Sequence, residues 1–379
     1  MARWNLFSRL GSMPRLCGRR PRQRRLQVEQ LESRDLFAFG DLDASFGTGG
    51  LATTSFFVAG LSRDEVADAA LQADGKVVSV GRVWIGSSVS LGITRHLADG
   101  TLDPTFGDGG IVTSPLAPLG PTSGGRSVAI QPDGKIVVAF GNGSQEVRVA
   151  RYLDDGQLDA TFGDAGIALF RWKDGLTVNE MLLRSNGDVL LVGNAAIGEQ
   201  SGYVTMAAIL FQFDSDGKLD ANFGQGGATL TTVRGFRDLA TDVAIQSDGK
   251  IVVSGTSNVL TGDRSLFVAR YSSTGVLDDQ FGNGDLAGVV RVDNFGATPW
   301  NDKDAAVGVV VQPSGRILLS ATRTVDVAKN DFTLIAIDSN GFLDASFGPT
   351  GSSGIQTTSI PGMQDAAARD VTLDSVGRI

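Results

Sequence analysis

The sequence predicts an all-β protein of the β-propeller class, built from units of about sixty residues with four strands each. Three observations predict this fold. A phrase of the form G-x-L-D-x-x-F-G occurs six times, a second glycine-centred phrase keeps step with it, and short apolar runs separate the two. The phenylalanines of the first phrase are Phe46, Phe106, Phe162, Phe223, Phe281 and Phe347, at intervals of 56 to 66 residues.

Each unit contains a predicted β-hairpin whose turn is the second phrase. In "QPDGKIV", Pro132 presets φ, Asp133 accepts hydrogen bonds within its own turn, and Gly134 adopts the left-handed conformation. Apolar runs at residues 127–131 and 135–140 flank this turn, and we read both as strands. The turn glycines of the six copies are Gly75, Gly134, Gly187, Gly249, Gly315 and Gly377.

Two further strands follow each hairpin. Residues 146–153 (EVRVARYL) alternate apolar and polar side chains, and residues 167–170 (IALF) form a short apolar run after the L-D-x-x-F-G turn. The first two strands are almost continuously apolar, so both of their faces must be covered by neighbouring units. Four antiparallel strands per unit, stacked around an axis, make a β-propeller of about six blades. A solenoid is the alternative.

Two segments have helix-forming compositions but are predicted to be strands. Residues 62–76 and 363–378 are rich in Ala and Asp, and the first segment also contains Glu65; these residue types favour helices or their first turns. Both segments align with the first strand of the repeat. We therefore expect the repeat to override the helix propensity.

The L-D-x-x-F-G phrase is predicted to be structural. Its aspartate can accept backbone N–H groups that follow it, its phenylalanine can insert between sheets, and its glycine can release the chain into the next strand. The alternative is a calcium loop at Asp214, Asp216 and Asp220, but the spacing lacks the closing glutamate, so no metal and no cofactor is expected. The structural residues are Asp43, Phe46, Asp103, Phe106, Asp159, Phe162, Asp220, Phe223, Asp278, Phe281, Asp344 and Phe347.

The repeat resembles a known family. "DGKIVV.G" followed by "VARY..DG.LD.TFG..G" is similar to the delta-60 repeat β-propeller family of large bacterial exported and surface proteins, over about residues 40–379. The third-strand arginine of the pattern is Arg95, Arg151 and Arg270, but Gln212 and Ala336 replace it in two units, so it is not needed in every blade. The resemblance implies an extracellular or cell-surface location.

The N-terminal segment differs in composition from the rest. Residues 1–40 hold nine arginines against three acidic residues, whereas residues 41–379 are acidic and carry the repeats. We expect a basic, disordered targeting tail followed by one propeller domain. Residues 27–38 (QVEQLESRDLFA) resemble the LEPRxLL sorting-type segment of bacterial surface proteins, with Ser33 and Phe37 as departures. Cys17, the only cysteine, lies in this tail, so no disulfide links the body.

Charge and hydropathy exclude two kinds of partner. An acidic body disfavours nucleic acid, whose binding depends on neutralising phosphates, and no apolar run reaches the length of a membrane span. The repeat around Gly377 contains only the beginning of a unit. We therefore expect a propeller truncated at its C-terminus, with an open sheet edge that favours self-association.

The variable segments are predicted to lie at one end of the blades. In a four-stranded meander the first and third turns, which carry the two repeated phrases, lie at one end of the sheet. The second turn and the connection to the next blade lie at the other end. Because only these last two vary, we expect a ligand surface there. An aromatic side chain beside polar acceptors suits the binding of a sugar ring. The alternative is that these side chains are partly buried and only hold their loops in place. The candidate ligand-binding residues are Trp300, Asn301, Asp302, Asp304, Trp84 and Tyr203.

Catalytic residues are not evident. His96, the only histidine, occupies a strand position that elsewhere holds Tyr152, Phe213 or Tyr271, so it is expected to pack. No zinc-ligand set, nucleophile elbow or P-loop occurs. The favoured function is a non-enzymatic extracellular binding or structural module for a glycan or protein. The alternatives are a carboxylate- or metal-dependent hydrolase or lyase at the loop face, and a fragment of a larger surface protein without independent function.

Overall fold

The computed structural model describes residues 42–56, 64–85, 88–114, 124–141, 145–233, 236–259, 264–282, 286–293, 305–326, 329–349, 353–359, 367–374 and 376–379. The chain divides into two units, Met1–Asp43 and Ala44–Ile379, and the strands lie in the second. Within these ranges regular secondary structure consists of β-strands alone. None of these residues belongs to a helix long and apolar enough to cross a membrane.

The strands form five antiparallel meanders of four strands each, which confirms the predicted fold. In chain order the blades are β1 (Glu65–Leu71), β2 (Val77–Ile85), β3 (Ser88–His96) and β4 (Ile111–Ser114); β5 (Gly125–Ile130), β6 (Ile136–Phe140), β7 (Glu146–Tyr152) and β8 (Ile167–Arg171); β9 (Leu176–Leu183), β10 (Val189–Gln200), β11 (Tyr203–Phe213) and β12 (Ala228–Thr231); β13 (Arg237–Ile245), β14 (Ile251–Asn258), β15 (Arg264–Tyr271) and β16 (Val289–Val292); β17 (Ala305–Val311), β18 (Ile317–Asp326), β19 (Lys329–Ile337) and β20 (Ile355–Thr358).

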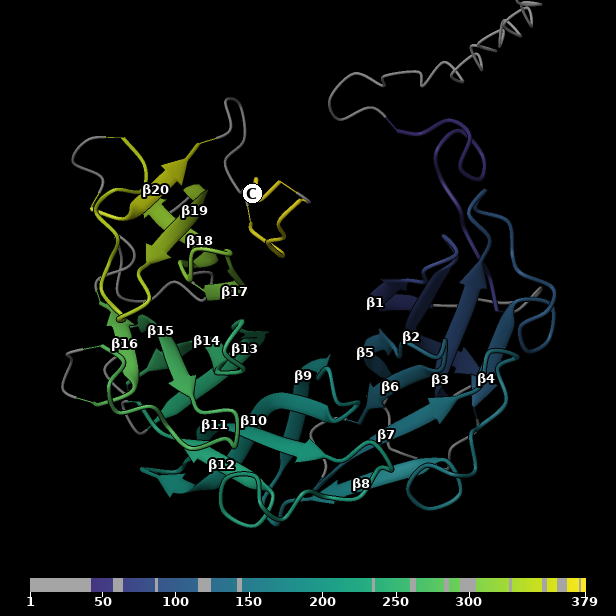
Figure 1. Cartoon of the computed structure of the whole chain (residues 1–379), viewed down its shortest axis with the longest axis horizontal. Helices are drawn as coiled ribbons and strands as arrows, with labels where there is room; N and C mark the ends of the chain where they lie inside the picture. The colour runs from purple at the N-terminus through teal and green to yellow at the C-terminus, as the bar shows by residue number, and fades with distance from the viewer. Residues whose placement is uncertain are drawn as a thin grey trace, which may run out of the picture. The chain divides into compact units, whose positions relative to one another are not determined.

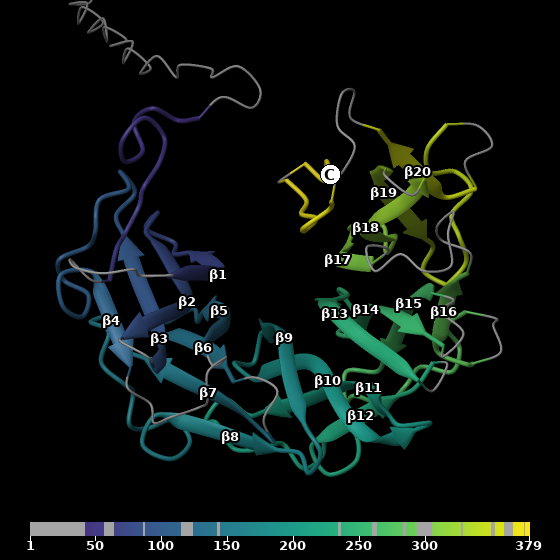
Figure 2. The same ribbon diagram turned by 180° about the vertical axis from the view of Figure 1, so that it is seen from behind.

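Within residues 44–379 the blades follow one another around a common axis (Figures 1 and 2). The first strand of every blade, from β1 to β17, lies nearest this axis, and the fourth strand lies outermost. Blades 3 and 4 also share one parallel backbone pairing, Met206 with Arg237. The innermost strands therefore form a common inner wall to which each blade contributes the same part of its sequence.

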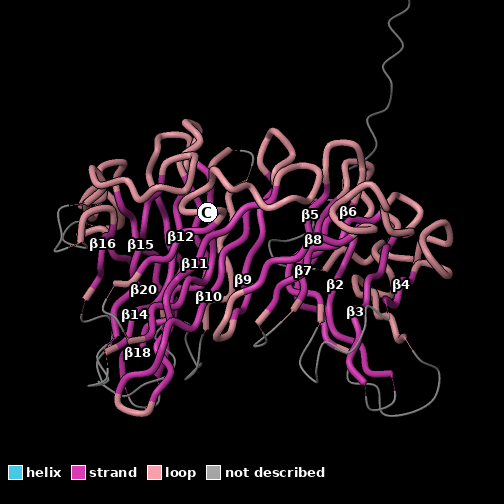
Figure 3. Tube along the Cα trace, turned by 90° about the horizontal axis from the view of Figure 1, so that it is seen from below, coloured by secondary structure: helices cyan, strands magenta, loops and turns pink. Residues whose placement is uncertain are grey.

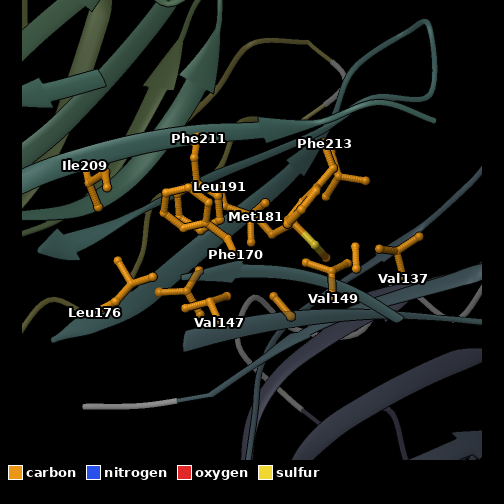
Figure 4. Close-up of a cluster of buried hydrophobic side chains, with 14 of the residues drawn as sticks. Val137, Val147, Val149, Phe170, Leu176, Met181, Leu191, Ile209, Phe211 and Phe213 are labelled. Atoms are coloured by element: carbon orange, nitrogen blue, oxygen red, sulfur yellow. The ribbon is translucent and has the colours of Figure 1, made fainter. Parts of the chain in front are cut away.

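The hydrophobic core lies between successive blades. One cluster joins Val149 of blade 2 to Leu191 and Phe211 of blade 3, all of which are fully buried (Figure 4). Phe170 of β8 stacks on Phe211 with 4.3 Å between the ring centroids. Each fully buried aliphatic or aromatic side chain contributes roughly 1.5–3 kcal/mol. Neighbouring blades thus supply the cover that the apolar strands require.

The structure confirms the predicted turn glycine. It also confirms one of the two segments that were predicted to be strands despite a helix-forming composition. Gly134 connects β5 to β6 with a φ of 86°, in the predicted left-handed region. The Ala-rich residues 65–71 form β1, because pairing with β2 outweighs their helix propensity. Residues 367–374, in contrast, are not a regular strand, so the prediction was wrong there. No described strand pairs with them, and strand conformation needs such a partner.

The C-terminal segment nevertheless packs as the first strand of a blade does. The N–H of Ala368 donates to Thr322 Oγ1 at 3.0 Å, as the N–H of Ala306 donates to Thr256 Oγ1 at 3.3 Å one blade earlier. Gln312 donates through Nε2 to the carbonyl of Gly377 at 3.3 Å. The inner wall therefore continues past blade 5.

The aspartate of each L-D-x-x-F-G turn organises the turn. Asp103 accepts the backbone N–H of Thr105 at 2.9 Å and its hydroxyl at 2.6 Å, and it also accepts Nε of Arg95 at 2.9 Å. Asp159 makes the equivalent contacts in blade 2. Burial acts to raise the pKa of Asp103, but the hydrogen bonds from Thr105 and the neighbouring cations outweigh it and hold the pKa at about 2.

The phenylalanine and glycine of the turn join each blade to the next. Phe106 is fully buried, with the guanidinium carbon of Arg95 4.7 Å from its ring centroid. A Cβ on Gly156, in the corresponding turn of blade 2, would lie 3.2 Å from this ring. The N–H of Gly107 donates to the carbonyl of Asp155 at 2.8 Å. This inter-blade contact recurs as Gly47–Asp99, Gly163–Asp216, Gly224–Thr274 and Gly282–Asn340.

Blade 3 keeps a guanidinium at this contact although its third strand carries Gln212. Arg184, which follows β9, donates through Nη1 to Gln212 Oε1 at 2.9 Å and to the carbonyl of Ser273 in blade 4 at 2.6 Å. Arg151 and Arg270 reach the equivalent carbonyls of the blades that follow them. The turn after the first strand therefore supplies the guanidinium that other blades take from the third strand.

Blade 5 makes a similar replacement where its third strand carries Ala336. Arg316, just before β18, donates through Nε to Asp344 at 2.7 Å and through Nη2 to Ser346 Oγ at 3.0 Å. Its guanidinium carbon lies 5.9 Å from the ring centroid of Phe347. The arginine is thus dispensable at the third strand. In blade 5 a guanidinium still contacts the L-D-x-x-F-G turn, and in blade 3 one still contacts the next blade.

Candidate functional site

Most of the predicted loop cluster lies outside the described residues: Trp300, Asn301, Asp302 and Asp304. Trp84, near the end of β2, is partly buried, and the guanidinium carbon of Arg82 lies 5.8 Å from its ring centroid. The backbone N–H of Trp84 approaches Asp64 Oδ1 at 3.4 Å. Trp84 therefore adjoins Arg82, which forms an ion pair with Glu65 of the first strand.

The aspartates of the calcium-loop alternative take part in turn hydrogen bonds. Asp214 Oδ1 accepts the N–H groups of Asp216 and Lys218, and Asp220 Oδ1 accepts the N–H of Asn222, all at 2.9–3.0 Å. Within the described ranges no three His, Cys, Asp or Glu side chains gather in a way that could hold a metal ion. These carboxylates serve the same turn geometry as their counterparts in other blades.

His96 lies at the end of β3 and is 9% exposed. Its Nε2 lies 2.9 Å from Thr54 Oγ1. Burial lowers the pKa of the imidazole, so it is neutral at pH 7. The equivalent strand ends carry Tyr152, Phe213 and Tyr271, all buried, so this position packs between blades.

The hairpin of β10 and β11 places Tyr203 at the loop end of blade 3. Its two-residue turn has Ser201 at φ 52° and Gly202 at φ 80°, the combination of a type I′ turn, which matches the twist of the flanking strands. Tyr203 follows directly and is 62% exposed. Figure 3 shows the strands running between the two ends at which such turns gather. By strand order, this turn lies at the end opposite the L-D-x-x-F-G turns.

Tyr203 forms one side of a pocket of about 460 Å³. The ring of Phe236 meets that of Tyr203 edge to face, with 6.0 Å between the centroids. The carbonyl of Phe236 accepts the N–H of Met206 at 2.9 Å, which fixes the approach to β13 against β11. Val204, Met206 and Arg237 complete the lining. The pocket thus combines an exposed aromatic ring, apolar surface and a guanidinium.

A second feature is a β-bulge at the same position of every innermost strand. Pairing between the first and second strands slips by one residue in all five blades, leaving one extra residue each time. Bulges of this kind redirect side chains beside functional sites. The extra residues are Ala67, Arg126, Asn179, Thr241 and Val307.

The residue after the bulge carries a carboxyl group in blades 1 and 4. Asp68 accepts the N–H of Ala69 in its own strand at 2.7 Å and that of Val128 in the next blade at 2.8 Å. Asp242 likewise accepts the N–H of the next residue at 2.7 Å and that of Val309 in blade 5 at 2.6 Å. These carboxylates bridge the innermost strands of neighbouring blades.

Glu180 occupies this position in blade 3. It accepts the hydroxyl of Ser127 in blade 2 at 2.6 Å and the N–H of Met181 at 2.9 Å. Burial is the main cause that raises its pKa, to about 7, and the charges of Asp68 and Asp242 act in the same direction. Burial, followed by the charge of Asp370, similarly raises the pKa of Asp242 to about 6. A carboxyl group that exchanges its proton near pH 7 is suited to acid–base chemistry.

None of the inner-wall carboxyl groups, Asp68, Glu180 and Asp242, was among the candidate site residues expected from the sequence. The repeat alignment contained the signal, because these residues lie three positions before the last residue of the first strand in their copies. Equivalent positions converge where blades surround an axis, so their charges interact. The residues at this position are Asp68, Ser127, Glu180, Asp242, Gly308 and Asp370.

A family model matches three parts of the chain. The family is described as a domain of unknown function (DUF5122) β-propeller, and its model covers residues 72–106, 131–162 and 246–281. Each match runs from the first hairpin turn to the phenylalanine of the L-D-x-x-F-G turn, in blades 1, 2 and 4. These are the blades with the third-strand arginine. A search of curated proteins finds no match.

Solved structures are similar at low sequence identity. A protein of unknown function from Dyadobacter fermentans is 12% identical, with 73% of this chain and 80% of that chain covered and a TM-score of 0.45. The polysaccharide lyase Uly1 is 13% identical, with 76% and 73% covered and a TM-score of 0.43. Bacillus subtilis levansucrase is 11% identical, with 82% and 89% covered and a TM-score of 0.38.

The assignment of the chain follows from its own strands and from the family model. Five four-stranded meanders surround one axis, and the three matched segments each cover most of one blade. The chain is a β-propeller repeat protein.

Proposed function

We propose that this protein is a non-enzymatic binding module that acts outside the cell or at the cell surface, and that it binds a glycan through the Tyr203 pocket. The observation that carries the proposal is the 62% exposed ring of Tyr203 beside Phe236 in a pocket of about 460 Å³. This volume lies within the range of small-molecule sites, which combine apolar lining with a few polar groups.

The chemistry of the pocket suits a sugar. The C–H face of a pyranose ring can stack on an exposed tyrosine, which loses little conformational entropy on binding because it has only two side-chain torsions. Arg237 can donate to the hydroxyl groups around that ring. Within the described part of the chain its guanidinium has no hydrogen-bond or ion-pair partner, so its donors remain available for a ligand.

Two resemblances support the proposed location. The repeats are similar to delta-60 repeats of bacterial exported proteins, and residues 27–38 resemble a LEPRxLL sorting-type segment. The nine arginines of residues 1–40 give this part a charge opposite to that of the repeats. Such an arrangement suits a targeting tail in front of a separate domain.

A glycan array with the full chain tests the proposal. Tyr203→Ala should weaken binding of any glycan found by at least tenfold, which corresponds to about 1.4 kcal/mol. Phe342→Ala is the matched control, because Phe342 is 45% exposed but belongs to the turn between the third and fourth strands, at the opposite end of its blade. Absence of glycan binding by the folded wild-type chain, or equal binding by Tyr203→Ala, would contradict the proposal.

The carboxyl groups of the inner wall support a second candidate function, a carboxylate-dependent hydrolase or lyase. Glu180, with its pKa near 7, is the residue we would assign as general acid or base. Polysaccharide cleavage assays between pH 5 and 9 test this candidate. Activity abolished by Glu180→Gln, with the fold retained, would favour the enzyme over the binding module.

A further inference from the structure

We infer that the inner wall of blades 1 to 3 holds a binding site for a carboxylate ligand, centred on Arg126. A pocket of about 320 Å³ opens there between the innermost strands β1, β5 and β9. It shares no lining residue with the Tyr203 pocket. The inference therefore adds a second site to the glycan site proposed above and does not depend on it.

The bulges build this site. Ala67, Arg126 and Asn179 are the extra residues of three successive blades, and all three line the pocket. A bulge residue is not paired with the neighbouring strand, whereas the residues around it are. Its side chain therefore points in a different direction from theirs. Blades 1 to 3 thus bring one small, one cationic and one amide side chain to the same height of the inner wall.

The charges in the pocket leave one cation without a partner. Arg82 donates through Nη2 to Glu65 Oε2 at 2.5 Å, so this pair compensates itself. Arg126 is half-buried, and its guanidinium has neither a hydrogen bond nor an ion pair with any residue in the described part of the chain. The charge of Glu65 also acts on Arg126, but Glu65 is paired with Arg82, and a partly buried cation without a direct partner is costly unless an anion pairs with it. In a chain with a net charge of −9, such a cation marks a place for an anionic ligand.

The geometry of the groups favours a carboxylate that carries hydroxyl groups. A guanidinium presents a planar fork that matches the two oxygens of a carboxylate. Asn179 is held in place because its Nδ2 donates to the carbonyl of Ala240 at 2.5 Å, and its Oδ1 can accept a hydroxyl. Glu65, at the rim, adds further acceptors. A volume of about 320 Å³ accommodates one sugar acid.

Calorimetric titration of the full chain with D-glucuronate tests the inference, with D-glucose as the uncharged probe of the same ring. We expect glucuronate to bind at least tenfold more tightly than glucose, and the glucuronate affinity to fall as sodium chloride is raised. Arg126→Gln should weaken glucuronate binding at least tenfold. Arg369→Gln is the matched control, since Arg369 occupies the bulge position of the C-terminal segment, is exposed and does not line the pocket.

A second variant keeps the test decisive if Arg126→Gln does not fold. Ala67 is exposed and lines the pocket, so Ala67→Asp should place a competing carboxylate beside Arg126 and abolish binding without disturbing the core. Arg126→Gln should weaken glucuronate binding to the same degree in a Tyr203→Ala background, which separates this site from the glycan pocket. No glucuronate binding by the wild type, or undiminished binding by folded Arg126→Gln or Ala67→Asp, would overturn the inference.

Discussion

Replacing Gly156 by alanine tests whether the repeated phrase holds neighbouring blades together. Gly156 has a φ of 86°, and a Cβ there would lie 2.9 Å from the nitrogen of Gly107 and 3.2 Å from the ring of Phe106 in the preceding blade. Gly134 also has a φ of 86°, but a Cβ there would meet nothing within 4 Å. The two substitutions therefore share the backbone strain and differ only in the inter-blade contact.

The expected destabilisation follows from these two terms. An alanine in the left-handed region costs roughly 1–2 kcal/mol at either position. Overpacking against the backbone and ring of blade 1 adds roughly 1–3 kcal/mol at Gly156 alone. Gly134→Ala should therefore cost about 1–2 kcal/mol, and Gly156→Ala about 2–5 kcal/mol. The entropy that alanine removes from the unfolded chain is the same in both variants and cancels in their difference.

Guanidinium unfolding of the full chain, followed by circular dichroism, measures this difference. The Gly156→Ala midpoint should lie clearly below that of Gly134→Ala. The dependence of its unfolding free energy on denaturant concentration should be shallower than in the wild type, because repeat proteins lose cooperativity where the interface between two repeats weakens. Equal destabilisation by the two variants, within about 0.5 kcal/mol, would show that the turn glycine has no inter-blade role and would refute this account of the phrase.

The remaining predictions concern charges. Arg184→Gln should destabilise the fold by about 1–3 kcal/mol because it removes charged hydrogen bonds between blades 3 and 4. As a control, substitution of the exposed Arg171 by Gln should change the unfolding free energy by less than about 1 kcal/mol. Equal effects of the two substitutions in thermal melts would contradict this prediction. Glu180, with its pKa raised to about 7, holds a proton in the fold that the unfolded chain releases, so stability should fall as the pH rises from about 4.5 to 7, by at most about 3 kcal/mol. Glu180→Gln should abolish this fall of stability with rising pH. An unchanged pH dependence of stability in urea unfolding would contradict the raised pKa of Glu180. Asp103, with its pKa lowered to about 2, acts in the opposite sense, and Asp103→Asn should reduce the loss of stability between about pH 4 and 2 in acid titrations followed by fluorescence.

The strands and turns of this fold could be predicted because their signals are local and repeated. Gly134 needs only its own turn to require a left-handed conformation, and its five counterparts give the same signal. Residues 65–71 show the strength of repetition, since the alignment predicted a strand that composition alone would assign to a helix. Residues 367–374 align equally well but lack a described pairing strand, so alignment alone does not determine strand formation.

The inner wall could not be predicted because it depends on distances around the axis. In the sequence, Arg126 and Asn179 look like ordinary strand residues. Only the shift in register between the first and second strands shows that they are the extra residues of β-bulges. Glu180 and Asp242 lie 62 residues apart in the sequence, yet their charges interact. Arg184 replaces a guanidinium that other blades take from a different strand. Such replacements preserve an interaction in space but move it to another position in the sequence. A repeat alignment therefore shows only that the third-strand arginine is missing.

Thermal unfolding of four purified variants tests most directly whether repeated residues hold the blades together while non-repeated residues form the binding surfaces. Gly156→Ala and Phe162→Ala alter inter-blade contacts, whereas Tyr203→Ala and Arg126→Gln alter the two proposed sites. We predict that the first two lower the melting temperature by several degrees and that the last two leave it within about two degrees of the wild type. Site variants that destabilise the fold as much as the contact variants would contradict this division, because Tyr203 and Arg126 would then be structural.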